Sequence, residues 1–390
     1  MLAHRWLARV VPVRPEEVRA LLWSFAYFFC LLAAYYILRP LRDEMGVAGG
    51  VRNLQWLFSA TFVTMLVAVP CYGALVARLP RRRFIPVVYH FFVANLAIFW
   101  LLLALGIDRQ TVARVFFVWI SVFVLFAVSV FWSFMADLYT SDQGKRLYGF
   151  IAAGGSAGAL AGPAITIGLA PAIGVVNLLL IAALLLEAAV ICAARLEVKK
   201  ENAAPTAQEK LGGGALDGIV MVLRSPYIAG IMLWVALLSV AATFLYFEQA
   251  AIVAAASDDP AVRTRIFASV DLAVGVLTLG VQFVATGKLI ERFGVGPALA
   301  LVPIVFAAGF AVLAAAPVLA VVIAFQALQR TANFAISNPA REVLFTVLAR
   351  GEKYKAKNVI DMVAVRGADA LGGWLVTGLR ALGMEARALA

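Results

Sequence analysis

Charged residues are scarce in this sequence of 390 residues: they make up 14% of the chain, whereas apolar residues make up 64%. Soluble globular domains carry about 25% charged and roughly 45–50% apolar residues. So few charges cannot cover a surface that faces water, which excludes an ordinary soluble protein. The composition therefore predicts an integral membrane protein whose main surroundings are the lipid bilayer.

Residues that serve metal and redox chemistry are also few. The three cysteines lie in separate apolar stretches without CxxC or zinc-ligand spacing, and the chain has two histidines. We therefore expect no metal site, no cofactor and no disulfide framework. No nucleophile–base arrangement or paired-carboxylate site stands out, so the sequence predicts no catalytic residue and no enzyme.

Long apolar runs supply the roughly 20 residues that a helix needs to cross about 30 Å of hydrocarbon. They are uncharged except for Asp271 in 266–287 and Asp361, Arg366 and Asp369 in 359–379. The runs cover residues 20–38, 54–77, 84–107, 115–136, 147–186, 225–247, 266–287, 293–329 and 359–379. Two of them are long enough for two spans each, with turns expected between Pro163 and Gly174 and near Pro317. The sequence thus predicts an all-α polytopic membrane protein with about 11 transmembrane helices, six in its first half and five in its second.

The longest polar stretch, residues 195–224, divides the chain. We expect it to be a cytoplasmic linker between an N-terminal six-helix bundle, 1–194, and a C-terminal five-helix bundle, 225–390. The two halves echo one another, since GALVAR at 73–78 and GKLIER at 287–292 follow corresponding spans. The pattern indicates a duplicated six-span unit whose second copy lacks its last span.

Basic residues set the expected orientation. With the N-terminus in the cytoplasm, basic clusters such as Arg81–Arg82–Arg83 and Lys145–Arg146 fall on the cytoplasmic side. The net charge of +11 is therefore a topology signal and does not indicate binding to nucleic acid. We expect a multi-pass protein of a bacterial inner membrane, and the oligomeric state stays open.

One loop motif resembles a known family. Residues 287–294, GKLIERFG, are similar to the loop motif of the major facilitator superfamily, in which the loop clamps cytoplasmic helix ends during transport. The resemblance implies a gating role for Glu291 and Arg292. The first-half copy departs from the motif, because Ala77 replaces the acid and Pro80 the glycine. The resemblance implies a two-bundle fold and transport by alternating access.

Several further motifs resemble one branch of that fold, the nucleotide transporter (ATP:ADP antiporter) family. They are YYILRPLRD at 35–43, FWSFMAD at 131–137, KRLYG at 145–149, NPARE at 338–342, and Asp361 followed by RGAD at 366–369. Together they cover most of the chain. The resemblance implies nucleotide exchange and places a basic–acidic pair, Arg42–Asp43, at the functional site.

Charges inside a membrane usually face a cavity or a charged partner, so they mark candidate functional residues. The predicted substrate-binding residues are Arg39, Arg42, Gln326, Arg330, Asn333 and Arg366. The predicted coupling or gating residues are Asp43, Glu248, Asp271, Asp361 and Asp369, together with the Glu291 and Arg292 of the loop motif.

Spacing supports some of these assignments. Arg39 and Arg42 share a helix face at the outer end of span one and could hold a phosphate or carboxylate, or equally serve structural pairing. Arg366 and Asp369, one turn apart, are expected to pair. Asp361 could titrate and couple transport to protons, or could pair with Arg330.

The candidate residues also include polar residues of span ten, the second span of the run 293–329, and single acids elsewhere. Gln326, Arg330 and Asn333 follow helical spacing, which predicts a face that lines a cavity. Glu248 and Asp271 could pair with cavity arginines, take part in coupling, or, for Glu248, lie at a solvated helix end.

The expected function is secondary active transport of a small, polar, anionic solute, with nucleotide exchange as the specific form. Two alternatives stay open. One is a proton-coupled facilitator for another metabolite or drug, and the other is a non-transporting membrane subunit or sensor derived from a transporter.

Overall fold

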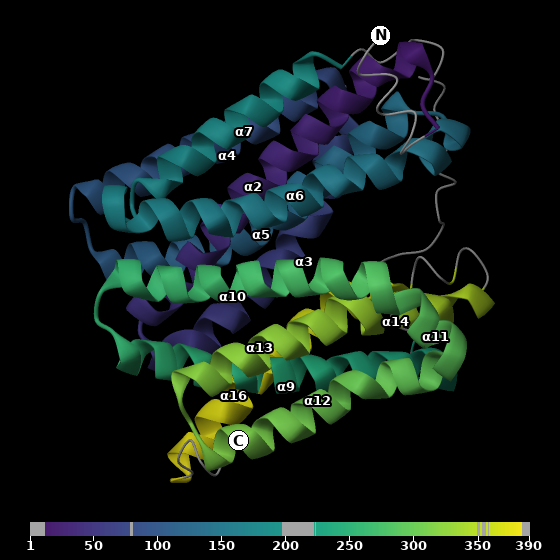
Figure 1. Ribbon diagram of the computed structural model, residues 1–390. Helices are drawn as coiled ribbons and strands as arrows, with labels where there is room; N and C mark the ends of the chain where they lie inside the picture. The colour runs from purple at the N-terminus through teal and green to yellow at the C-terminus, as the bar shows by residue number, and fades with distance from the viewer. Residues whose placement is uncertain are drawn as a thin grey trace. The chain divides into compact units, whose positions relative to one another are not determined.

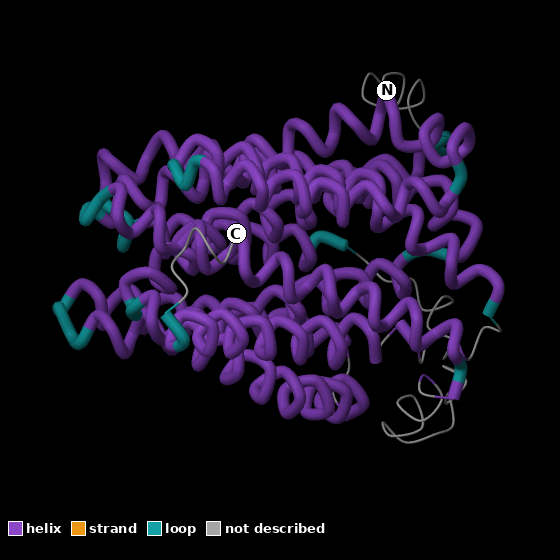
Figure 2. Tube along the Cα trace, turned by 90° about the horizontal axis from the view of Figure 1, so that it is seen from below, coloured by secondary structure: helices purple, strands orange, loops and turns teal. Residues whose placement is uncertain are grey.

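The structure is a computed structural model that describes residues 12–78, 81–196, 222, 224–348, 352, 356–357 and 359–383. Within these ranges every regular element is a helix and no strand occurs, as Figure 2 shows. The expected all-α class is confirmed for this part of the chain. The predicted linker at 195–224 lies almost wholly outside the described residues, so the division into bundles at this point stays a prediction.

Six long helices occur in the first half of the described chain (Figure 1). They are α2 (Val18–Ala48), α3 (Leu54–Arg78), α4 (Arg81–Ala104), α5 (Arg109–Leu138), α6 (Ser141–Ile173) and α7 (Leu178–Ala194). Short 3-10 turns, η1 (Pro15–Glu17) and η2 (Val51–Asn53), come directly before α2 and α3. The six apolar segments predicted for the first half are therefore all helical.

Five helical segments occur in the second half, and three of them contain a π-helical turn. Two of them are single helices, α9 (Pro226–Ala256) and α12 (Val295–Ala315). Helix α10 (Pro260–Val281) continues through η4 (Gln282–Thr286) into α11 (Gly287–Phe293), and η7 (Val359–Ala364) leads into α16 (Val365–Ala381). Helix α13 (Leu319–Ala332) continues through η5 (Asn333–Ser337) into α14 (Asn338–Leu344) and the 3-10 turn η6 (Phe345–Val347). Such π turns are often found at functional sites.

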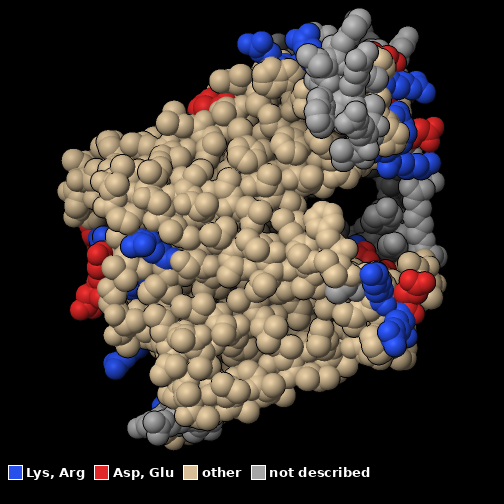
Figure 3. All heavy atoms as spheres, viewed as in Figure 1, with Lys and Arg blue, Asp and Glu red and all other residues tan. Residues whose placement is uncertain are grey.

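The surface of these helices is suited to lipid. Eight helices of the described part are long and apolar enough to cross a membrane, and α7 is a shorter apolar helix of 17 residues. Large apolar side chains such as Phe283 and Leu184 are exposed by 87% and 69%. On the face drawn in Figure 3, charged side chains gather near helix ends and leave broad uncharged surface between them. The protein is therefore a multi-pass membrane protein.

Contacts group the chain into two compact units. Unit 1 comprises Met1–Glu44, Ala68–Gln208 and Phe267–Ser269, and unit 2 comprises Met45–Val67, Glu209–Ile266 and Val270–Ala390.

The turns differ in part from the expected positions. Helix α6 passes through Pro163 and Pro171 and ends at Ile173, and the chain turns at Gly174 with a φ of 81°. Only the last residue of the expected Pro163–Gly174 window makes the turn, because lipid-facing helices tolerate internal proline when neighbouring helices pack against them. The break near Pro317 is confirmed, since α12 ends at Ala315 and α13 begins at Leu319.

Close packing inside unit 1 depends on small residues of α6. A Cβ atom added to Gly158 would lie 2.4 Å from the carbonyl oxygen of Phe29, and one added to Gly154 would lie 2.5 Å from that of Phe25. Helices α2 and α6 therefore approach more closely than any side chain on these glycines would permit. The glycine-rich stretch of α6 therefore serves helix packing.

Candidate functional site

A buried ion pair joins α10 and α13 inside unit 2. Arg330 Nη1 lies 2.7 Å from Asp271 Oδ1, and the two side chains are exposed by 14% and 2%. The predicted binding residue Arg330 and the predicted coupling residue Asp271 are thus in direct contact. The ring of Phe334, one turn along, lies 6.0 Å from the Arg330 guanidinium.

The alternative pairing of Arg330 with Asp361 is wrong in this structure. Asp361, in η7, instead lies 3.0 Å from Arg341 Nη1 of α14. Arg330 and Arg341 belong to one continuous helical segment, with the π-helical η5 between them. Each arginine pairs with an acid on a different helix, and sequence spacing carries no signal for such pairs.

The predicted polar face of span ten is mostly buried within unit 2. Gln326 and Gln329 of α13 are buried, and Asn333 at the start of η5 is half-buried. Gln326 Nε2 donates a hydrogen bond of 2.8 Å to Gln249 Oε1 of α9. Gln249 is not among the residues predicted for the site.

Glu248 does not lie at a solvated helix end. Helix α9 continues for two turns beyond it to Ala256, and the Glu248 side chain is 4% exposed. Its carboxylate accepts a hydrogen bond of 2.7 Å from Arg380 Nη2. Arg380 lies just beyond the predicted run 359–379, but it belongs to the last turn of α16, which brings it to α9.

Helix α16 carries the predicted local pair. Arg366 Nη1 lies 3.3 Å from Asp369 Oδ2, and Thr243 Oγ1 of α9 donates to Asp369 Oδ1 at 3.5 Å. The expected Arg366–Asp369 contact is present. Gly373 allows close packing here, since an added Cβ would lie 3.2 Å from the Cα of Gln55. Gln55 lies in the first turn of α3, in the part of that helix that belongs to unit 2.

Unit 1 holds the other predicted arginines. The Arg42 guanidinium stacks over the Phe117 ring at 4.0 Å and lies 3.3 Å from Asp43 Oδ1, while the Arg39 guanidinium lies 5.8 Å from the Tyr36 ring. Arg42 Nε is buried and has no hydrogen-bond partner among the described residues. These residues were expected at the end of span one, but α2 continues to Ala48.

A second ion pair near this point was missed. The Glu44 side chain is fully buried and lies 3.3 Å from Arg109 Nη2, in the first turn of α5. The adjacent Asp108 caps α5, and a hydrogen bond from Thr111 Oγ1 lowers the pKa of this exposed carboxyl below its usual value. Glu44 directly follows Asp43, so a fourth charge in the segment 39–44 was the available signal.

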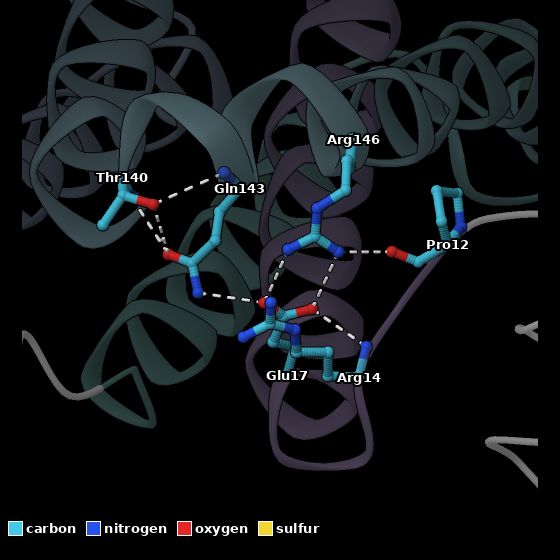
Figure 4. Close-up of polar contacts among 6 residues, drawn as sticks. All are labelled: Pro12, Arg14, Glu17, Thr140, Gln143 and Arg146. Atoms are coloured by element: carbon cyan, nitrogen blue, oxygen red, sulfur yellow. Dashed lines mark hydrogen bonds and ion pairs between the residues drawn. The ribbon is translucent and has the colours of Figure 1, made fainter.

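Figure 4 shows another polar cluster of unit 1, where η1 meets the start of α6. Arg146 Nη2 and Gln143 Nε2 donate to the Glu17 carboxylate at 2.9 and 3.0 Å, and Arg146 also donates to the Pro12 carbonyl. Thr140 and Gln143 form a capping box at the start of α6. The sequence placed Arg146 in the KRLYG motif and in a basic cluster of the cytoplasmic side but not at a site, and Glu17 was missed.

The residues of the loop motif, Glu291 and Arg292, lie in α11 and are exposed. The Arg292 guanidinium lies 5.7 Å from the Phe293 ring. Their expected gating role stays a prediction. Among the described residues, no group of three or more His, Cys, Asp or Glu side chains has the arrangement of a metal site.

Comparison with known proteins decides the family. The model of the Major Facilitator Superfamily matches residues 21–353, most of the chain. The chain belongs to the major facilitator superfamily. This member is a secondary transporter with a small-molecule substrate, not an enzyme, and the predicted two-bundle fold is confirmed. No curated protein matches the sequence.

Solved structures of other major facilitator proteins share the fold at low sequence identity. The nucleoside transporter NupG is 14% identical, with a TM-score of 0.67 and coverage of 95% of this chain and 92% of that one. A bacterial homologue of the iron transporter ferroportin is 13% identical, with a TM-score of 0.66 over 97% and 98%. The xylose transporter XylE from E. coli is 13% identical, with a TM-score of 0.57 over 92% and 88%. A nucleoside transporter and a xylose transporter share this fold, so the fold alone does not define the substrate.

Proposed function

We propose that this major facilitator protein transports a small, polar, anionic solute that binds at Arg330 in place of Asp271. The observation that carries the proposal is the 2.7 Å ion pair between these residues, with Asp271 buried to 98%. An ion pair in such a place is costly to desolvate and contributes little to stability compared with apolar packing. Its presence favours a functional role.

The arginine has capacity for a second anion. Arg330 Nε is buried and has no hydrogen-bond partner among the described residues, although Nη1 contacts Asp271. A guanidinium binds carboxylate and phosphate groups through two parallel hydrogen bonds. Nε is enclosed in this structure, so a solute anion would engage it once the Asp271 carboxylate has moved away. The anion would then satisfy an unpaired donor and compete with Asp271 for the same cation.

Nucleotide exchange is the specific form that we propose for this transport. The motifs that resemble the nucleotide transporter family support it, and a solved structure with the same fold is a nucleoside transporter. Arg366, which lies in the same unit as Arg330, would then contribute a further phosphate contact, and the phosphate role of Arg39 and Arg42 of unit 1 stays a prediction. Rocking of the bundles 1–194 and 225–390, joined by the linker 195–224, would expose the site to each side in turn.

Proton coupling is the second candidate, and the same ion pair favours it. Protonation of Asp271 releases Arg330, so that a proton and an anionic solute can bind together. Glu248, paired with Arg380, and Asp361, paired with Arg341, are the other acids that could carry the proton. Exchange requires no such acid.

Counterflow in proteoliposomes tests both forms. Liposomes loaded with ATP should accumulate labelled ADP at the same rate with and without a pH gradient if the protein is an exchanger. A rate that collapses when a proton ionophore is added would favour proton coupling. Absence of any nucleotide uptake or binding would contradict the nucleotide form.

The placement in the membrane is also a proposal. The basic clusters at 81–83 and 145–146 support an N-terminus in the cytoplasm, and we place the protein in a bacterial inner membrane. Reporter fusions to the N-terminus that are active only in the periplasm should be silent. An active periplasmic reporter would contradict this orientation.

A further inference from the structure

Two glutamine side chains meet between α9 and α13 of unit 2. Gln326 Nε2 donates to Gln249 Oε1 at 2.8 Å, and the residues are 6% and 5% exposed. They are flanked by the apolar cluster that contains Leu245, Val322 and Phe325. A pair of amides in such surroundings is costly to desolvate unless its hydrogen-bonding groups are satisfied.

The single hydrogen bond leaves part of this capacity unused. Within the described residues, no group hydrogen-bonds with Gln249 Nε2 or Gln326 Oε1, and neither atom is among those fully enclosed without a partner. Neither atom is therefore wholly enclosed by the protein. The pair has one free donor, the Gln249 amide nitrogen, and one free acceptor, the Gln326 carbonyl oxygen, for a bound solute to use.

The amide pair lies close to the proposed anion site. Gln326 and Arg330 are four residues apart on α13, so they share a face and are separated by about 6 Å along the helix. A solute whose anion is bound by Arg330 would bring atoms about 6 Å away to the two glutamines.

We propose that Gln249 and Gln326 determine substrate specificity by binding a planar edge that carries a donor beside an acceptor. Nucleobases and carboxamides have such an edge, and a glutamine amide pairs with adenine in this way. This inference rests on the proposed function of Arg330 and names the substrate class: an anion joined over a short distance to a nucleobase or carboxamide. A nucleoside monophosphate has both parts.

Titration calorimetry of the full chain in lipid nanodiscs tests the proposal. The probes are adenosine 5′-monophosphate and ribose 5-phosphate, which differ by the base. The intact protein should bind the first at least about 10-fold more tightly, as expected for one well-formed pair of base contacts. Gln249→Leu and Gln326→Leu should each reduce this ratio to near one, and the double variant should lose no more than either single variant.

The control variant is Gln110→Leu, which changes an exposed glutamine of α5 and should keep the ratio. If a leucine variant does not fold, a third probe tests the proposal on the intact protein alone. Purine riboside 5′-monophosphate lacks the amino donor that Gln326 Oε1 would accept, so the intact protein should bind it about 10-fold more weakly than adenosine 5′-monophosphate.

The inference and the proposed function fail in different ways. Equal affinity for the three probes, or a ratio that persists in both leucine variants, overturns the role of the glutamines. Ribose 5-phosphate binding that is unchanged in Arg330→Gln contradicts the anion site instead. In that case the ratio of the affinities for adenosine 5′-monophosphate and ribose 5-phosphate still tests the role of the glutamines.

Discussion

Replacement of Asp271 by asparagine tests the buried ion pair most sharply. The change keeps the size and one acceptor oxygen but removes the negative charge, so Arg330 keeps its positive charge in an environment where the partner carboxylate was 2% exposed. Breaking one side of a buried pair costs about 3–5 kcal/mol, and we expect the lower end, about 3 kcal/mol, because asparagine still accepts a hydrogen bond.

The expected shift of the melting temperature follows from the chain length. At about 2.1 cal/mol/K per residue, a chain of 390 residues has an unfolding entropy of about 0.8 kcal/mol/K, so 3 kcal/mol corresponds to about 4 °C. Thermal unfolding in detergent micelles followed by intrinsic fluorescence measures this shift. Asp258→Asn, at an exposed acid before α10, is the matched control and should change stability by less than about 0.5 kcal/mol.

Two further observations complete this test. The double variant Asp271→Asn, Arg330→Gln removes both charges and should recover most of the lost stability, because no uncompensated charge remains. Inorganic phosphate should raise the melting temperature of Asp271→Asn more than that of the unchanged protein, since the vacant guanidinium binds it. A single variant as stable as the unchanged protein, or a double variant less stable than both singles, would refute the reasoning.

Three further predictions concern other parts of the molecule. Thr286→Val removes a hydrogen bond of 2.8 Å from η4 to a carbonyl of the π-helical η5. The variant should lose about 1 kcal/mol of stability in thermal unfolding and should transport at a different rate. An unchanged rate and an unchanged stability would count against a role for this contact. Gly158→Ala should destabilise the protein by about 1–3 kcal/mol because the added Cβ would lie 2.4 Å from a backbone oxygen. The control Gly168→Ala, at a glycine with open space around it, should be neutral or slightly stabilising. Equal effects of the two variants would contradict the close packing. Glu17→Gln should lower the free energy of unfolding by about 2–3 kcal/mol, because it removes charge-assisted hydrogen bonds. The exposed neighbour Glu16 provides the control, and Glu16→Gln should leave this free energy unchanged. Urea-induced unfolding in micelles measures both variants.

The helices were predictable because apolar runs of membrane length admit only one structure. Their ends were less predictable, since a run of uncharged residues stops at the first charge although the helix does not. Helix α2 continues ten residues beyond Leu38 to Ala48, because Arg42 and Glu44 find partners on α5 inside unit 1 and need not reach water. The same reason explains why Glu248 lies within α9 and not at its end.

Ion pairs followed a similar division. The contact between Arg366 and Asp369 was predictable because helical spacing places residues three apart on one face. The partners of Arg330 and Asp361 were not, because they come from helices whose rotation about their axes depends on packing. The π-helical turns beside these residues add a further change of register that composition does not encode.

Counterflow by the protein with Arg330 replaced by glutamine tests the central claim most directly. Proteoliposomes loaded with ATP are compared for uptake of labelled ADP, with the exposed Arg52→Gln as the matched control. The account predicts that Arg52→Gln transports normally and that Arg330→Gln, although folded, loses uptake by at least about 10-fold, the effect of one lost charge-assisted contact. Uptake by Arg330→Gln at the rate of the unchanged protein would contradict the account.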